Sequence, residues 1–278
     1  MLLQDFLSLA LAPSNFETMG VLFGLMAVFA AVELFVPLYA RDRSGRPHAV
    51  PNMLLTVLTF GFGLFFGAAI LILLAWQQAA GFGLLNAYQV PPLWALLAGV
   101  LVLDFATYVC HVAMHKVPGW WRFHRVHHSD FAVDVTTSFR QHPGETIIRY
   151  AFLVAAGSAL GVSPVAFAIY RTLSALSALV EHANVRVPVW LDDVLSLVVT
   201  WPTLHKVHHS RDARETDTNF GNIFSIWDRL FLTFTPVRRG REVIYGLDGF
   251  DDARHHTAAG LLALPFRGEA RAAPATRE

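Results

Sequence analysis

Ten of the 13 histidines lie between residues 111 and 209, and their spacing is typical of metal ligands. His111 and His115 are four residues apart, so a helix would place both imidazoles on one face. Two more clusters each hold three histidines at positions i, i+3 and i+4, which also share a helical face. These clusters are His124, His127 and His128, and His205, His208 and His209.

The second and third clusters resemble each other beyond their histidines, because HRVHHS at 124–129 is matched by HKVHHS at 205–210. Two similar half-sites predict two metal ions. His142 and His182 raise the pool from eight imidazoles to ten, which gives four or five nitrogens for each ion. We expect the three remaining histidines to be ordinary surface or core residues; these are His48, His255 and His256.

The type of ligand restricts the metal. Imidazoles suit iron, zinc, copper or nickel, whereas magnesium and calcium prefer oxygen ligands. The only cysteine is Cys110, so thiolates do not supply the site. Zinc has no redox chemistry, and a two-metal hydrolase would usually show bridging carboxylates. The prediction is therefore a pair of redox-active iron ions, with zinc as an adventitious replacement.

The composition predicts an integral-membrane protein. Hydrophobic residues make up 54% of the chain, charged residues make up 15%, and the mean hydropathy is +0.45. Lys+Arg and Asp+Glu are both 21, so the charge balance does not favour a nucleic-acid partner. The first residues lack a basic segment, and Gln4 and Asp5 interrupt their apolar run, so we expect no cleaved signal peptide.

The predicted fold is all-α, a single membrane domain built as a helical bundle with a helical cap that holds the histidines. About 20 apolar residues cross a bilayer, and residues 19–40, 53–76 and 93–110 meet that length. The apolar stretch 147–181 is interrupted at 161–164 by Gly-Val-Ser-Pro, which predicts a helical hairpin. Residues 111–146 and 182–267 are the two histidine-rich segments, and 268–278 is a flexible tail.

The loop charges predict the orientation in the membrane. Arg41, Arg43 and Arg46 lie between the first two spans, whereas residues 77–92 carry no charge. The positive-inside rule then places residues 41–50 in the cytoplasm. Counting the spans and the hairpin brings every histidine-rich segment to that same cytoplasmic side.

At these histidines the chain resembles the fatty acid hydroxylase and sterol desaturase superfamily of membrane di-iron proteins. The resemblance runs from about Asp104 to Phe234, and the first 100 residues match only in hydropathy. The motifs that carry it are HxxxH at 111–115, HRVHHS at 124–129, RQHPGE at 140–145, EHANVRVP at 181–188, LHKVHHS at 204–210 and TNFGNIFSIWDRLFLTF at 218–234.

The resemblance implies a di-iron centre on the cytoplasmic side of a four-to-six-helix bundle. It also implies O₂-dependent hydroxylation or desaturation of an unactivated C–H bond in a lipid. The substrate is open among sterols, fatty acyl chains, ceramides, carotenoids and alkyl ethers, and the motifs do not decide between hydroxylation and desaturation. A membrane metal transporter is the alternative, although transport predicts ligands within the bilayer.

Several polar residues are predicted to support the histidines. Asp104 lies two helical turns before His111 on the same face, where its carboxylate would orient that ring. We assign it to the catalytic residues, and a buried packing partner is the other reading. Asn184 and Asn222 match family positions and are assigned to the catalytic machinery, with helix capping as the other reading for them and for Asn219. Other carboxylates are candidates for the same supporting role or ordinary loop residues: Asp130, Asp134, Asp212, Asp217 and Glu181.

Two charged residues in apolar segments, Glu33 and Arg171, are expected to reach the membrane interface. Residues 120–123 are read as an interfacial aromatic belt. His142-Pro143-Gly144 is similar to the haem-binding motif of cytochrome b5, but Glu145 replaces its second glycine and no separate haem domain is present. No dinucleotide-binding motif is found either. Electrons must therefore come from an external donor of the ferredoxin or cytochrome b5 type.

Overall fold

A computed structural model describes residues 6–8, 10–40, 48–236 and 243–268, and these residues form helices joined by short loops. Within these ranges, β pairing is limited to the bridges Pro37–Val185 and Val199–Phe224. The predicted all-α fold class is confirmed. The α-helices are α2 (Pro13–Phe35), α3 (Ala49–Ala79), α4 (Leu84–Ala87), α5 (Pro92–Lys116), α6 (Pro118–His128), α7 (Pro143–Leu160), α8 (Pro164–His182), α9 (Val189–Ser196), α10 (Pro202–His208), α11 (Ala213–Thr216), α12 (Ile226–Leu230) and α13 (Ala258–Ala263).

Three stretches are long and apolar enough to cross a membrane: Phe6–Phe35, Ala49–Ala87 and Pro92–Lys116. They correspond to the three predicted spans. The first ends earlier than the predicted limit at residue 40, because the chain leaves the helix and the Leu38 amide donates to the Asn184 carbonyl. The third continues past residue 110 to Lys116, so His111 and His115 stand on its last turns.

The helical hairpin predicted between residues 147 and 181 is confirmed as α7 and α8. Gly161 ends α7 with a φ of 78°, a conformation that favours glycine. A Cβ at this position would lie 2.8 Å from both the Phe82 carbonyl oxygen and the Asn86 side-chain nitrogen. Ser163 then caps α8 by accepting a hydrogen bond from the Ala166 amide. The turn therefore depends on a small residue as well as on the proline that follows.

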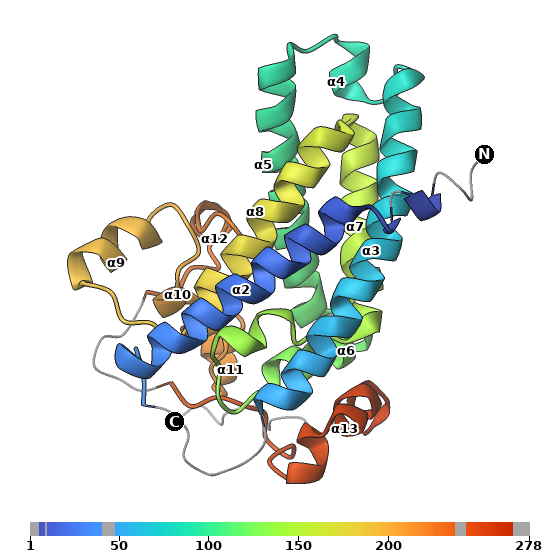
Figure 1. Ribbon diagram of the computed structural model, residues 1–278. Coiled ribbons are helices and arrows are strands. Elements are labelled where there is room, and N and C mark those ends of the chain that lie inside the picture. Colours follow the sequence, from blue (N-terminus) through green and yellow to red (C-terminus); the bar gives the residue numbers. More distant parts are fainter. Residues whose placement is uncertain (1–5, 9, 41–47, 237–242, 269–278) are drawn as a thin grey trace.

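The bundle core lies between α3, α5, α7 and α8, which pack against one another (Figure 1). Leu74 of α3, Leu103 of α5, Leu153 of α7 and Tyr170 of α8 are all buried in one cluster. α2 crosses this bundle obliquely and contacts α8. The short helices α6, α10, α11 and α13 lie in the half of the molecule away from α4 and form a cap (Figure 1). In this cap, α6 carries His124, His127 and His128, and α10 carries His205 and His208.

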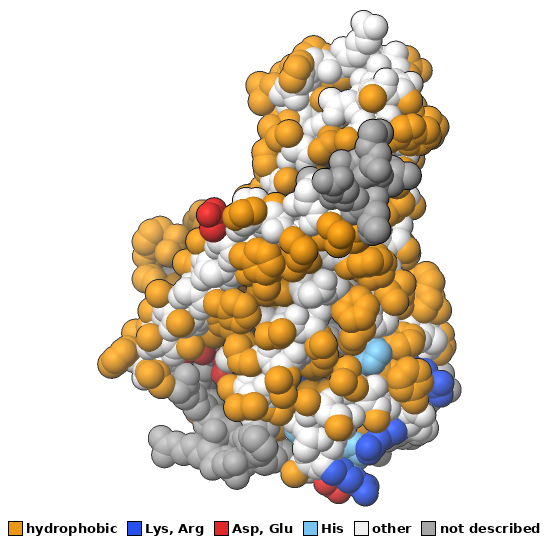
Figure 2. Space-filling view, turned by 45° about the vertical axis from the view of Figure 1, so that its right-hand side comes forward, with side chains coloured by type: hydrophobic (Ala, Val, Ile, Leu, Met, Phe, Trp, Pro, Cys, Tyr) orange, Lys and Arg blue, Asp and Glu red, His pale blue; other side chains and the backbone are white. Residues whose placement is uncertain are grey.

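The surface is that of a membrane protein. Figure 2 shows hydrophobic side chains over most of the visible face, while the lysine and arginine side chains on it gather at its lower end. The side chains of Trp76, Trp94 and Leu101, on the apolar helices, are exposed. Large apolar groups in such positions are stable in contact with lipid rather than water. The arginines that predict the orientation, at 41, 43 and 46, lie outside the described residues, as do residues 269–278 of the predicted tail.

Candidate metal centre

Nine histidines form two groups. Within each group every histidine offers one ring nitrogen, and these nitrogens all lie within 4.8 Å of one another. The first group contains five imidazoles and the second contains four. Their rings adjoin, since His128 and His209 stack with centroids 4.6 Å apart. We name them the five-histidine group (His111, His115, His124, His128 and His208) and the four-histidine group (His127, His182, His205 and His209).

Each three-histidine cluster shares a helical face, as expected, but its rings divide between the two groups. His124 and His128 belong to one group, while His127 belongs to the other. In a helix, position i+4 is rotated by about 40° from position i, whereas i+3 is rotated by about 60° in the opposite sense. The i, i+4 pair therefore belongs to one group, and the i+3 ring belongs to the neighbouring group.

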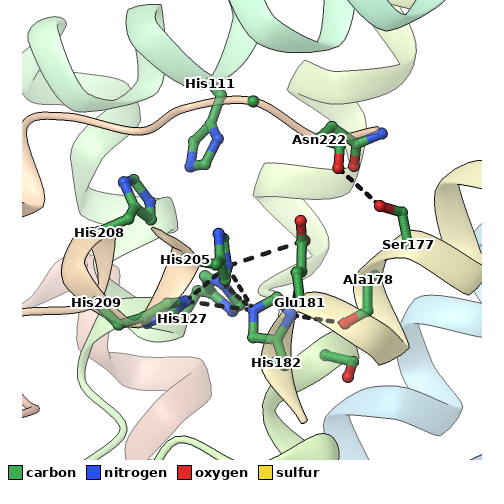
Figure 3. Close-up of polar contacts among 12 residues, drawn as sticks. His111, His127, Ser177, Ala178, Glu181, His182, His205, His208, His209 and Asn222 are labelled. Atoms are coloured by element: carbon green, nitrogen blue, oxygen red, sulfur yellow. Dashed lines mark hydrogen bonds and ion pairs between the residues drawn. The ribbon is translucent and has the colours of Figure 1, made fainter. Parts of the chain in front are cut away.

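The inner nitrogens are placed as ligands of a shared ion would be. In the five-histidine group, the Nε2 atoms of His111 and His124 are 3.0 Å apart, and those of His115 and His128 are 3.2 Å apart. In the four-histidine group, Nε2 of His182 lies 3.0 Å from Nε2 of His205. Metal–nitrogen bonds of about 2.1 Å place two ligands at right angles about 3 Å apart. Figure 3 shows several of these rings pointing toward one another.

Backbone carbonyls hold the outer nitrogens of several rings. The Nδ1 atom of His111 is 2.9 Å from the Phe220 carbonyl oxygen, and that of His208 is 2.8 Å from the Thr218 oxygen. Nδ1 of His182 is 2.8 Å from the oxygen of Ala178. A proton donated from Nδ1 to a carbonyl leaves the Nε2 lone pair free for a metal.

Carboxylates hold two more rings of the five-histidine group. Nδ1 of His124 is 3.0 Å from Glu145, and Nδ1 of His115 is 3.3 Å from Asp217. The fit to a metal is further supported by Nε2 of His208, which is buried without a hydrogen-bond partner. A cation would satisfy that lone pair. The donor set therefore suits two imidazole-ligated ions.

Burial keeps the cap histidines neutral. The side chains of His124, His127 and His128 are almost fully buried. Burial, reinforced by the charges that neighbouring imidazoles would carry, holds the pKa of all three well below its usual range. The same causes lower the pKa of His205 and His209. Neutral imidazoles near pH 7 are ready to bind metal without losing a proton first.

His142, predicted as a ligand, does not join either group. Its Nδ1 accepts a hydrogen bond from the Gly144 amide and caps α7, while its Nε2 lies 3.3 Å from the Leu262 carbonyl oxygen. Both nitrogens are thus engaged away from the histidine groups, and we remove His142 from the proposed ligand set. His48, His255 and His256 also lie outside the groups, as expected.

Asp104 does not orient His111 as the helical spacing predicts, because Phe220 already bonds that ring. Its carboxylate instead accepts hydrogen bonds from the amides of Ile223 and Phe224, at 3.0 and 3.2 Å, and from the Trp227 indole at 2.8 Å. Asp104 therefore fixes the loop that follows Phe220. Its influence on the ring passes through this loop.

The two asparagines have different positions. Asn184 exchanges hydrogen bonds with the backbone of Tyr39, and so fastens the segment after α2 to the end of α8. Asn222 donates to Ser174 at 3.0 Å and to Asp104 at 3.3 Å, and its side chain lines the same cavity as four of the histidines. Of the two, Asn222 is placed to affect a bound substrate.

Three other acidic residues have separate positions. Glu181 lies 3.7 Å from Nδ1 of His182 and 3.9 Å from Nε2 of His205, and Figure 3 shows it beside these rings. Asp212 caps α11. Glu33 is buried and accepts from the Val135 and Asn184 amides, so the expectation that it reaches the membrane interface is wrong.

Asp130 and Asp134 do not contact a ligand ring. Both bind His48, whose Nδ1 and Nε2 are each 2.9 Å from one carboxylate. Asn52 at the start of α3 donates to Asp130, and Arg140 donates to Asn52. This buried network fastens the segment after α6 to the first turn of α3.

Glu145 is the functional candidate that the sequence did not single out. It is fully buried, accepts from His124 and from Arg149, and connects α7 to α6. The nearest sequence signal is its place in RQHPGE, three residues after His142. A contact across 21 residues has no helical period to reveal it.

A cavity of about 410 Å³ opens beside the histidines. His111, His127, His182 and His205 form part of its wall. Most of the other lining residues come from α2, α3, α7 and α8, and many of them are apolar, including Leu22, Phe60, Leu64, Leu153 and Phe167. A cavity of this size, mostly apolar with a few polar groups, is typical of a site for a small organic molecule.

A sequence model of the family described as fatty acid hydroxylase matches residues 96–233, the part of the chain that holds both histidine groups. The chain is 31% identical over 158 residues to an alkylglycerol monooxygenase of Caenorhabditis elegans, covering 55% of this chain and 30% of that protein. It is 30% identical over 186 residues to the ornithine lipid hydroxylase OlsE of Rhizobium tropici, covering 66% and 54%. A cholesterol 25-hydroxylase-like protein of Danio rerio is 29% identical over 143 residues, covering 50% and 55%.

The chain thus spans about a third to a half of the length of these relatives. No solved structure matches the chain significantly.

Proposed function

The chain belongs to the fatty acid hydroxylase and sterol desaturase superfamily, and from that premise we propose that it is an O₂-dependent di-iron hydroxylase of a membrane lipid. The observation that carries this proposal is the position of the two histidine groups. They adjoin each other, and both contribute side chains to the wall of one cavity in the membrane bundle. The side chains that would hold the ions thus face a largely apolar space that is large enough for part of a lipid.

The five-histidine group would hold one ion and the four-histidine group the other. When bound, a pair of redox-active iron ions supplies the activation of O₂ that attack on an unactivated C–H bond needs. The protein holds the rings by the outer-nitrogen bonds to Phe220, Thr218, Ala178 and Glu145. Rings fixed in this way keep their inner nitrogens in place during a change of metal charge.

The substrate is proposed to reach the metals along the cavity. Its walls come from helices of the membrane bundle, so a hydrocarbon chain can enter from the bilayer without crossing water. Asn222 and Ser174, which bond to each other at the histidine end, would orient a polar group near the reacting carbon. The apolar lining excludes water from the reaction.

Hydroxylation is favoured over desaturation because the relatives reported above are named as hydroxylases and monooxygenases. These names refer to an alkylglycerol, an ornithine lipid and a cholesterol, which share a lipid character rather than a head group. The same resemblance favours an enzyme over a metal transporter.

The electrons are proposed to come from an external ferredoxin or cytochrome b5 that docks on the cap, which we place on the cytoplasmic side. Two reporters fused in turn to the C-terminus test this orientation: a fluorescent protein that is active in the cytoplasm, and a phosphatase that is active only in the periplasm. We expect the first fusion to fluoresce and the second to have no phosphatase activity. The reverse pattern would contradict the orientation.

Metal analysis is the first test of the function. Protein purified without oxygen and with added iron should contain two iron ions per chain, and Mössbauer spectra should show them as a pair. One iron per chain would count against the di-iron proposal. Zinc bound after aerobic purification does not bear on it, because zinc occupies imidazole sites readily.

Substitution of one ligand from each group tests the link between metal and activity. His127→Ala and His208→Ala should each lower the iron content and abolish lipid hydroxylation, while the protein still inserts in the membrane. Lipid extracts of cells with and without the gene, compared by mass spectrometry, give the product. Full turnover by both variants would contradict the proposal.

A further inference from the structure

The cavity wall carries a positive charge that the metal chemistry does not use. Arg171 lies near the middle of α8 and lines the cavity that His111, His127 and His182 also line. Its guanidinium carbon is 5.1 Å from the centre of the Tyr150 ring. Tyr150 is itself buried, and its hydroxyl donates to the Gly63 carbonyl at 3.3 Å. The guanidinium therefore rests on a fixed aromatic face in the cavity wall.

No carboxylate among the described residues makes an ion pair with Arg171. The other arginine in the wall, Arg149, is neutralised by Glu145 at 2.8 Å. The acidic residue of the wall is Glu181, which lies ten positions further along α8, about 15 Å at the rise of an α-helix. Among the residues that the structure describes, the guanidinium of Arg171 thus has the Tyr150 ring as its partner and no carboxylate. A guanidinium in an apolar segment is costly, and such residues tend to mark a binding site.

Polar side chains share the wall with Arg171. Thr172 follows it on α8, and Ser14 and Thr18 of α2 line the same cavity. Hydroxyl groups and a guanidinium together are the donors that a carboxylate or a phosphate accepts. Phe60, Leu64 and other apolar side chains of the wall offer contact to hydrocarbon instead. The cavity is therefore matched to a molecule with an anionic group and an apolar chain.

We infer that Arg171 binds the anionic group, a carboxylate or a phosphate, of an amphiphilic substrate whose hydrocarbon chain occupies the apolar part of the cavity beside the histidines. The inference rests on the proposed function, because it assigns the class of substrate to the same site. Arg171 then acts as a positioning residue, which holds the charged end of the lipid at a fixed place relative to the metals.

Equilibrium binding to the purified full-length protein in a neutral detergent at pH 8 tests the inference. Three radiolabelled probes with the same chain are compared: hexadecanol, hexadecanoate and hexadecyl phosphate. The wild type should bind one or both anions at least about ten-fold more tightly than the alcohol, which corresponds to about 1.4 kcal/mol. A preference for hexadecanoate points to a free acid, and one for hexadecyl phosphate points to a phosphorylated head group.

Arg171→Gln should lose this preference while its affinity for hexadecanol stays within about two-fold of wild type. Arg171→Lys should keep part of it, because the charge remains. Arg171→Met provides a second neutral side chain of similar length if the glutamine variant does not fold. Arg214→Gln is the matched control, since the side chain of Arg214 is 80% exposed and does not line the cavity; it should behave as wild type.

A purely structural role for Arg171 would change the binding of all three probes together. Equal affinity of the wild type for the alcohol and both anions, or an unchanged preference in Arg171→Gln, would overturn the inference. Binding needs neither iron nor turnover. Anion preference in a protein that has no hydroxylase activity when loaded with iron would contradict only the proposed function, whereas turnover of neutral lipids without anion preference would contradict only this inference.

Discussion

The outer nitrogens of the histidines are not held equally in the two groups. All five rings of the five-histidine group have a hydrogen-bond partner at Nδ1, and one of these partners is the buried carboxylate Glu145. In the four-histidine group only His182 has such a bond, because the Nδ1 atoms of His127, His205 and His209 are buried without a partner among the described residues. Ring orientation is therefore better fixed in the first group.

Glu145 is a single side chain whose loss should weaken metal binding. Glu145→Gln keeps an acceptor near His124 but removes the charge that raises the basicity of that ring and neutralises Arg149. Loss of such a partner typically lowers metal affinity about 10- to 100-fold. Competition with a calibrated chelator measures the change. Asp248→Asn is the control, because that carboxylate is 59% exposed, and equal losses in both variants would contradict the assignment.

Substitutions of His142 and His182 distinguish helix capping from metal binding. His142→Asn should leave the metal content unchanged, since asparagine also caps helices and this ring lies outside both groups. His182→Ala should lose the metal of the four-histidine group. Metal analysis of both variants decides the matter, and a loss of metal from His142→Asn would return that residue to the ligand set.

At the scale of the elements, the turns matter because they set the relative height of the helices that carry ligands. α7 carries Glu145 and α8 carries His182, so the Gly161 turn fixes one relative to the other. Gly161→Ala should destabilise the protein by about 1–3 kcal/mol, because alanine is strained at a φ of 78° and its Cβ meets the Phe82 carbonyl.

Gly20→Ala in α2 is the matched control for that turn. A Cβ at Gly20 meets nothing within 4 Å, so alanine there should be neutral or should stabilise the helix by up to about 1 kcal/mol. Thermal unfolding midpoints in the same detergent compare the two. If both variants unfold at the wild-type temperature, the turn does not require a glycine at position 161.

The first turn of α3 is fastened to the segment after α6 through an ionised histidine. Burial by itself would lower the pKa of His48, but the charges and hydrogen bonds of Asp130 and Asp134 outweigh it and raise the pKa to about 10. His48 is thus protonated in the folded protein at pH values where it would be neutral in the unfolded chain. Its contribution to stability is complete below pH 6.5 and is lost as the pH rises through 10.

The wild type should therefore unfold at progressively lower temperature between about pH 6.5 and 10. In His48→Gln this decline should be shallower, and the variant should be less stable than wild type at pH 6.5. Parallel pH profiles of the unfolding midpoint measure both effects. The two aspartates have lowered pKa values and stay ionised throughout this range, so they add no slope of their own. Identical slopes for both proteins would show that His48 carries no extra proton.

At the scale of the whole molecule, the two metals should differ in how firmly they are held. The four-histidine group has one ligand fewer and only one fixed outer nitrogen. A chelator should therefore remove iron in two phases, with the ion of this group leaving first. His182→Ala should abolish the fast phase, and His111→Ala should abolish the slow one. A single phase, or the opposite assignment, would contradict the difference.

Removal of both ions should also destabilise the fold, because the ligands come from α5, α6, α8 and α10 and the ions join these helices. Binding to the folded state adds about 2.7 kcal/mol when free metal is 100 times the dissociation constant. The unfolding midpoint should fall on chelation and recover when Fe²⁺ is restored.

Local patterns in the sequence were enough to predict the long helices and most of the histidines in the two groups. Runs of apolar residues predict membrane helices because the bilayer has a fixed thickness, and the i, i+4 spacing predicts neighbouring imidazoles because the helix has a fixed pitch. The spans, the hairpin at Gly161 and the family all follow from such patterns. His111, His115 and the two triples were identified in the same way, and the structure brings all eight together.

Tertiary structure alone decided which ring belongs to which histidine group, which polar group holds each ring, and what the cavity wall contains. The separation of His127 from His124 and His128, the contact of Glu145 with His124, and the removal of His142 depend on how α6, α7 and α10 pack. Asp104 shares a helical face with His111, yet its nearer partners are amides brought from residues 223 and 224. A hydrogen bond acts over about 3 Å, so spacing along one helix cannot predict partners that other segments supply.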